Sequence, residues 1–199
     1  MRHLLVLISF ATLLSTLSDT PAQPPAKKPM RREVDLTEGS AAPDFSIKDL
    51  KGEKAVKLSD LRGKPVVLIF GSCTWPPFVK SVGQIEKLYA AHKTNAHIFV
   101  VYIREAHPNE RNNQFQIGEP KTLKERQEVA GDFAKKLKLS LPILVDAMDD
   151  PVDKLYAGWP DRIYVIDRDG NIALKGDPGP GGFSPSVRAA FEVLDKRIK

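Results

Sequence analysis

The chain has 199 residues, of which 42% are hydrophobic and 28% charged. This balance excludes a wholly disordered protein and fits one globular domain with additional terminal segments. Thirty basic residues face 25 acidic ones and leave a net charge of +5, an excess too small and too mixed to indicate nucleic-acid binding.

The first 22 residues are predicted to be a signal peptide. An apolar run over residues 4–14 follows Arg2, and it is shorter than a membrane-spanning helix. Small residues at Thr20, Pro21 and Ala22 offer a cleavage site; the alternative is a buried N-terminal helix. We therefore expect an exported protein, periplasmic or extracellular after cleavage, without stable membrane insertion.

Residues 23–41 are rich in proline, lysine and arginine and have no apolar period, which predicts an extended, disordered linker. The folded domain is expected to cover residues 42–199. A domain of that length buries enough apolar surface to be stable without disulfides.

Within the expected domain, short apolar segments alternate with segments of helical period. Two short strands at 45–47 and 55–58 precede a continuous apolar strand at 65–70, which is typical of a parallel sheet buried on both faces. A helix begins near Pro76 or Pro77, because proline is tolerated in the first helical turn. The later elements are strand 97–103, helix 123–137, strand 142–145, a hairpin of strands 162–166 and 171–174, and helix 187–198.

This order is typical of a thioredoxin-like α/β fold, a central mixed sheet flanked by helices, with an N-terminal β extension. Parallel strands require helical crossovers, and the hairpin supplies an antiparallel edge. Periodicity alone leaves other α/β folds open.

The segment most informative about chemistry is residues 70–78, which joins the buried strand to a helix and contains Cys73, the single cysteine. One cysteine excludes an internal disulfide and a cysteine-based zinc site, so we predict no metal centre. Unpaired amides at a helix N-terminus stabilise a thiolate and lower its pKa. Cys73 is therefore a candidate nucleophile, and the alternative is a small buried residue at a strand end.

Four segments carry a family resemblance. Residues 71–78 read Gly-Ser-Cys-Thr-Trp-Pro-Pro-Phe, and residues 102–108 read Tyr-Ile-Arg-Glu-Ala-His-Pro. Residues 145–149 (Val-Asp-Ala-Met-Asp) and 162–166 (Arg-Ile-Tyr-Val-Ile) follow in the same order. Over about residues 60–197 the chain resembles the iodothyronine deiodinases, thioredoxin-fold selenoenzymes that reductively remove iodine from thyroid hormones.

The resemblance implies an oxidoreductase with no bound cofactor and an external thiol reductant. Cys73 would be a resolving thiol, and Glu105 and His107 would assist proton transfer and substrate placement. Thr74, Pro76, Phe78, Pro160 and Arg162 are the implied substrate-binding residues. The implied partners are a small aromatic or thiol/disulfide substrate and a redox partner protein. The family is often dimeric, so the resemblance also implies a homodimer as one assembly of this chain.

The chain departs from the family pattern at the centre of the site. Trp75 stands at the selenocysteine position, and an indole can neither take up iodonium nor attack a disulfide. The family's histidine before residue 123 aligns with Pro120, and its late arginine aligns near Pro178. Trp75 is therefore either core filling or a stacking platform for an aromatic ligand.

Glu105 and His107 lie two residues apart at the end of a strand, so their side chains point to the same side. The carboxylate would orient the imidazole as a general acid, or the two would form a solvated ion pair. Pro160 lies within one residue of the place where thioredoxin folds carry a cis-proline that faces the active loop. We expect all these residues to converge with Cys73 and Trp75 at one end of the sheet.

Two functions follow from these observations. The sequence favours an exported thioredoxin-fold oxidoreductase that works through the Cys73 thiol, with hormone deiodination itself doubtful because the redox residue is lost. The alternative is a redox-inactive binding protein that uses the Trp75 loop as a ligand or partner pocket.

Overall fold

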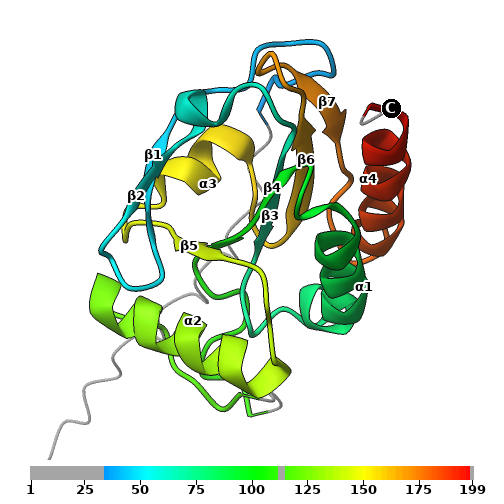
Figure 1. Ribbon diagram of the computed structural model, residues 1–199. Helices are drawn as coiled ribbons and strands as arrows, with labels where there is room; N and C mark the ends of the chain where they lie inside the picture. Colours follow the sequence, from blue (N-terminus) through cyan, green and yellow to red (C-terminus); the bar gives the residue numbers. More distant parts are fainter. Residues whose placement is uncertain (1–33, 112–114, 198–199) are drawn as a thin grey trace, which may run out of the picture. The chain divides into compact units, whose positions relative to one another are not determined.

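The computed structural model describes residues 34–111 and 115–197. The predicted signal peptide and the linker residues 23–33 lie outside the described residues. The described part forms a seven-stranded sheet with strand order β2-β1-β5-β4-β3-β6-β7, flanked by helices (Figure 1). No helix in these two described ranges is long and apolar enough to cross a membrane.

The centre of the sheet contains three parallel strands. They are β3 (Val66–Gly71), β4 (His97–Tyr102) and β5 (Ile143–Val145). β3 is buried at every position because it lies between β4 and β6 and has a hydrophobic core on each face, as its continuous apolar sequence predicts.

Antiparallel strands complete both edges. β6 (Arg162–Ile166) pairs with β3, and β7 (Ile172–Lys175) pairs with β6 through the predicted hairpin. On the other edge β1 (Ser46–Asp49) pairs with β5, and β2 (Ala55–Lys57) pairs with β1. The predicted N-terminal β extension therefore continues the sheet.

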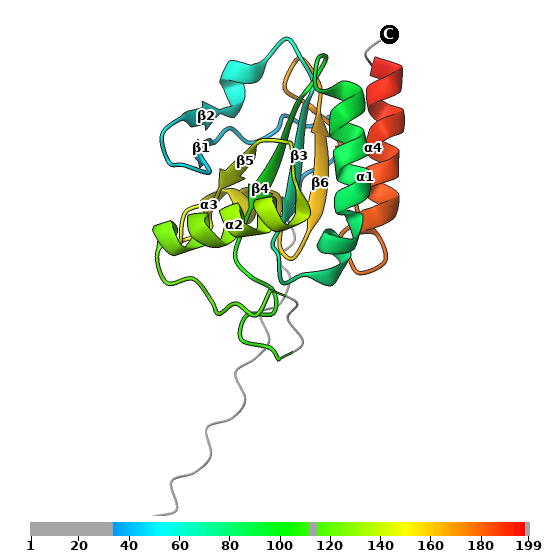
Figure 2. The same ribbon diagram turned by 60° about the horizontal axis from the view of Figure 1, so that its bottom comes forward.

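Side-chain alternation along β3 divides the core into two layers. Val67 and Ile69 face α1 (Pro76–His92), α2 (Leu123–Leu137) and α4 (Phe183–Arg197). Leu68 and Phe70 face the 3-10 helix η1 (Leu58–Leu61) and α3 (Pro151–Tyr156). Helices α1 and α4 lie side by side along one face of the sheet, as Figure 2 shows.

One helix and two boundaries differ clearly from the sequence-based expectation. α3 was not predicted, and α4 begins at Phe183 instead of residue 187. The ordered chain also begins before residue 42. Gly39 donates its amide to the Ile172 carbonyl and Ala41 forms a bridge with Asn171, because the edge strand β7 offers free backbone groups to the incoming chain.

Candidate functional site

The site lies at the carboxyl end of β3, in the loop that leads into α1. Trp75 is the N-cap residue of α1 and offers no capping hydrogen bond. Pro76 and Pro77 occupy the first helical positions, as predicted, and they lack amide hydrogens. Val79 donates its amide to the Trp75 carbonyl, so the helix start presents few free amides to an anion.

Cys73 is buried, with 1% of its surface exposed. Its amide donates to the Tyr102 hydroxyl at 3.2 Å, and its Sγ lies 3.8 Å from Glu105 Oε2. Burial, and then the negative charge of Glu105, raise the pKa of the Cys73 thiol far above its ordinary value. The sequence-based expectation of a lowered pKa is therefore wrong, since the side chain points into the core and not toward the amides of the helix end.

Glu105 is the buried centre of the polar contacts around the loop. It accepts hydrogen bonds from the Tyr102 hydroxyl at 2.5 Å and from the Thr74 hydroxyl and amide at 2.6 and 3.1 Å. The Thr74 hydroxyl also accepts the amides of Ala106 and His107, each at 3.1 Å. Thr74 is itself buried. It therefore connects its own loop with the loop after β4, in place of the substrate contact that the resemblance implied.

His107 has a different carboxylate partner from the one expected. Its Nδ1 lies 2.8 Å from Glu110 Oε1, whereas Glu105 accepts hydrogen bonds from Thr74 and Tyr102. The expected orientation of the imidazole by Glu105 is therefore wrong. The reason is that the chain turns after Glu105, which places one side chain in the core and leaves the other half-buried at the surface.

Trp75 and His107 form an aromatic wall. Their rings stack with centroids 5.4 Å apart and an interplanar angle of 17°. Trp75 is partly buried, and its buried indole N–H has no hydrogen-bond partner among the described residues. This wall lines a pocket of about 480 Å³. The other lining residues come from α1 and from the segment before and into α4, namely Pro76, Pro77, Lys80, Ser81, Pro180 and Ser184.

The remaining predicted site residues are divided between the pocket and the core. Pro76 lines the pocket. Phe78 is fully buried and stacks on Phe133, so it cannot contact a ligand in the pocket as the resemblance implied. Arg162 is also buried and donates from Nε to the Ala157 carbonyl at 2.9 Å, which places its side chain in the interior.

The Pro160 turn approaches the site through its residue Asp161. The Trp159–Pro160 peptide bond is cis. Asp161 accepts the Gly179 amide at 2.5 Å. A Cβ placed on Gly179 would lie 2.7 Å from Asp161 Oδ2 and 3.0 Å from Trp75 Nε1. Cys73 thus contacts Glu105, Trp75 contacts His107, and the Pro160 turn approaches Trp75 through Asp161 and Gly179.

Sequence reasoning missed several residues of this site. Tyr102 belongs to a quoted motif, yet its role as a donor to Glu105 depends on the rotamer of a fully buried ring. Glu110 was not identified, although its spacing of three residues from His107 could have suggested a pair. Lys80 lies one turn into α1 and reaches the pocket. In the two described ranges, no group of three or more His, Cys, Asp or Glu side chains is arranged to hold a metal ion.

Comparison with solved structures shows the fold. The thioredoxin domain of a thiol-disulfide oxidoreductase from Bacteroides vulgatus has a TM-score of 0.58 at 23% identity, covering 82% of this chain and 99% of that one. A secreted disulfide oxidoreductase from Mycobacterium tuberculosis has a TM-score of 0.53 at 19% identity, covering 73% and 95%. The chain therefore has the thioredoxin-like fold that these oxidoreductases share.

Comparison of sequences identifies the family within this fold. The Type I iodothyronine deiodinase of Xenopus laevis is 33% identical over 172 residues, which cover 84% of this chain and 67% of that protein. The thyroxine 5-deiodinase of Gallus gallus is 32% identical over 168 residues, 81% of this chain and 64% of that protein. The chain thus spans about two thirds of the length of these relatives. The iodothyronine deiodinase family model matches residues 27–195, and the chain belongs to the iodothyronine deiodinase family.

Proposed function

We propose that this chain is an exported member of the deiodinase family that binds an aromatic ligand in the pocket beside Trp75 and His107. The observation that carries the proposal is the parallel stack of these two rings on the wall of a pocket of about 480 Å³. A ligand ring can extend such a stack at little cost in entropy, because both wall rings are already held in place.

The chemistry of the other pocket walls favours a ligand that also bears a negative charge. Whereas the Ser81 and Ser184 hydroxyls already donate to the Pro77 carbonyl and to Gln84 Oε1, the Lys80 ammonium lines the same pocket and can bind a carboxylate or a phenolate. Thyroxine, which the name of the chicken relative gives as its substrate, has both an aromatic ring system and such groups. It is therefore the first ligand to test.

Binding is measured by equilibrium dialysis with radioiodinated thyroxine, which also reports free iodide. Trp75→Ala should weaken binding about tenfold or more, because removal of a central aromatic wall costs at least about 1.4 kcal/mol. Trp75→Phe keeps a stacking face and should retain most of the affinity. No saturable binding by the wild-type protein, or equal binding by Trp75→Ala, would refute the proposal.

A thiol-dependent oxidoreductase is the second candidate, because Glu105 Oε2 lies 3.8 Å from the Cys73 Sγ and can accept its proton. Cys73 would attack a substrate disulfide while its proton passes to Glu105. A mixed disulfide then forms on Cys73, and the departing thiolate recovers the proton. An external thiol reduces the mixed disulfide and restores Cys73. This route requires the loop to open, because the thiol is buried.

Two observations separate the candidates. Disulfide reduction or iodide release with dithiothreitol should be abolished by Cys73→Ser if Cys73 carries the reaction, and should be unaffected if it does not. The codon for residue 75 is also decisive. UGG would establish that tryptophan has replaced the redox residue, whereas UGA would mean that the position is read as selenocysteine.

Export is the remaining part of the proposal. It is supported by the apolar run over residues 4–14 followed by small residues at 20–22. Fractionation of the producing cell, with sequencing of the N-terminus of the mature protein, tests it. A chain that keeps its first 22 residues and stays in the cytoplasm would refute it.

A further inference from the structure

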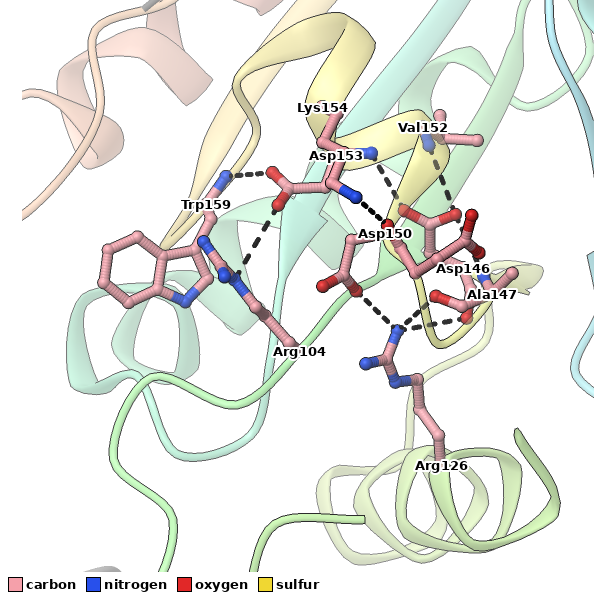
Figure 3. Close-up of polar contacts among 10 residues, drawn as sticks. Arg104, Arg126, Asp146, Ala147, Asp150, Val152, Asp153, Lys154 and Trp159 are labelled. Atoms are coloured by element: carbon pink, nitrogen blue, oxygen red, sulfur yellow. Dashed lines mark hydrogen bonds and ion pairs between the residues drawn. The ribbon is translucent and has the colours of Figure 1, made fainter. Parts of the chain in front are cut away.

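A buried cluster of charged residues surrounds the start of α3, next to the segments that flank the site (Figure 3). Asp153, which is 5% exposed, accepts the Trp159 amide at 2.7 Å and lies 3.8 Å from Arg104 Nε. The Arg104 guanidinium in turn lies over the Trp159 ring, 4.9 Å from its centroid. One carboxylate therefore connects the turn at residue 159 with the loop that follows β4.

Both of these segments lead toward the surroundings of the Trp75 indole. The turn at residue 159 continues to Asp161, whose carboxylate, like the indole nitrogen of Trp75, lies within about 3 Å of the point where a Cβ on Gly179 would be. The loop at Arg104 continues to His107, whose ring stacks on the Trp75 indole. Each of the two segments that Asp153 connects therefore leads to a residue beside the Trp75 indole or beside Gly179.

Asp153 is itself held firmly. Its amide donates to Asp146 Oδ2 at 2.8 Å, and Asp146 also accepts the Val152 amide. Arg126, a buried side chain from α2, donates to Asp150 Oδ1 at 2.8 Å and to two carbonyls of the same loop. Figure 3 shows Arg126 reaching from α2 to this loop. The start of α3 is thus anchored to a second helix, so Asp153 is a fixed point for the segments it binds.

We propose that Asp153 is a positioning residue for the Trp75 pocket: it fixes the Trp159–Asp161 turn against Arg104 and so holds the indole between His107 and Gly179. This inference rests on the proposed function, in which that indole is the wall of a ligand pocket. Asp153 binds both segments that lead to the surroundings of the indole, the turn at residue 159 and the loop at Arg104.

The test uses Trp159→Phe as the background. This change leaves Trp75 as the single tryptophan, and it keeps both the amide that Asp153 binds and an aromatic ring under Arg104. Asp153→Ala and Asp153→Asn are compared in this background. The asparagine still accepts the backbone amide hydrogen of residue 159 but carries no charge to attract Arg104. Asp132→Asn is the matched control, because it removes the same charge from an exposed residue whose ion-pair partner is Lys135 at 3.6 Å.

The first readouts need no ligand: acrylamide quenching of Trp75 fluorescence and the ring-proton shifts of His107 by proton–carbon NMR. We expect both to change in Asp153→Ala, to change less in Asp153→Asn, and to stay unchanged in Asp132→Asn. Thyroxine affinity should fall about twofold to thirtyfold in Asp153→Ala, the range of about 0.5–2 kcal/mol seen for residues that act through others, with partial recovery in Asp153→Asn.

The outcomes separate the two proposals. Wild-type protein that does not bind thyroxine refutes the proposed function, while the fluorescence and NMR readouts still test Asp153. If Asp153→Asn melts at a lower temperature but leaves Trp75 quenching and the His107 shifts unchanged, Asp153 is a stability residue and the positioning role is refuted. Asp153→Ala is informative only where it folds, so Asp153→Asn alone decides the question if it does not.

Discussion

Replacement of Trp75 by cysteine would place a thiol at the N-cap of a 17-residue helix. The magnitude of the resulting pKa change follows from the local hydrogen bonds. The two prolines after position 75 have no amide hydrogens, and the Val79 amide is already bonded to the carbonyl of residue 75. The amide of Phe78 is the donor left for a thiolate at this helix start.

One charge-assisted hydrogen bond and the partial charge of the helix end together stabilise a thiolate by about 2 kcal/mol. At 1.36 kcal/mol for each pH unit, this lowers the pKa of the new thiol from about 8.5 to roughly 7. Helices that begin without proline offer more amides and would lower the pKa further. The expected reactivity is therefore intermediate between that of an ordinary surface cysteine and that of a strongly activated one.

The stability of Trp75→Cys should fall by about 1–3 kcal/mol, less than the 3–5 kcal/mol typical of a large aromatic side chain removed from a core. Two features reduce the cost. Trp75 is only partly buried, and its buried indole N–H finds no partner in the part of the chain that the structure describes, so its removal relieves an unfavourable desolvation. Urea unfolding of the variant and the wild-type protein measures the difference.

The assay is the rate of alkylation by iodoacetamide as a function of pH. Wild-type protein is the control for Cys73, which should react slowly at every pH because it is buried and its pKa is raised. An apparent pKa of 8.5 or above for the new thiol, or a rate at pH 7 no faster than that of wild type, would refute this account of the loop.

Three further substitutions test the surroundings of the site. Gly71→Ala should destabilise the fold by about 1–3 kcal/mol in urea unfolding, because its Cβ would overlap the Phe78 ring; Phe78→Leu in the same chain should recover part of the loss. Glu105→Ala should cost about 3 kcal/mol by the same measurement, since the buried Thr74 amide loses its acceptor, and a cost below 1 kcal/mol would contradict this. Burial raises the pKa of Asp146 to about 6, against an ordinary value of 3.8, so between these pH values the folded chain binds more protons than the unfolded chain. The free energy of unfolding should therefore fall by up to about 3 kcal/mol as the pH rises through this window, and Asp146→Asn should abolish this part of the slope; a variant with the wild-type slope would show that another group is responsible.

The sequence by itself determined the order of the main elements and the position of the site. The continuous apolar run of β3, the prolines that open α1 and the turn of the β6–β7 hairpin are local signals, because each follows from the conformational preferences of neighbouring residues. The motif at residues 71–78 also identified the family, since its match depends on residue identity and not on geometry.

Only the tertiary structure decided the roles of individual side chains. α3 has six residues, too few for a helical period to be visible, and its first amides are bound by Asp146 from the preceding loop. Cys73 lies in a segment that favours a thiolate in sequence, yet its side chain packs into the core beside Glu105. The pairing of His107 with Glu110 depends on where the chain turns after β4. Burial and partner choice are set by contacts between segments far apart in the chain, and these contacts determine whether a thiol or a carboxylate is reactive.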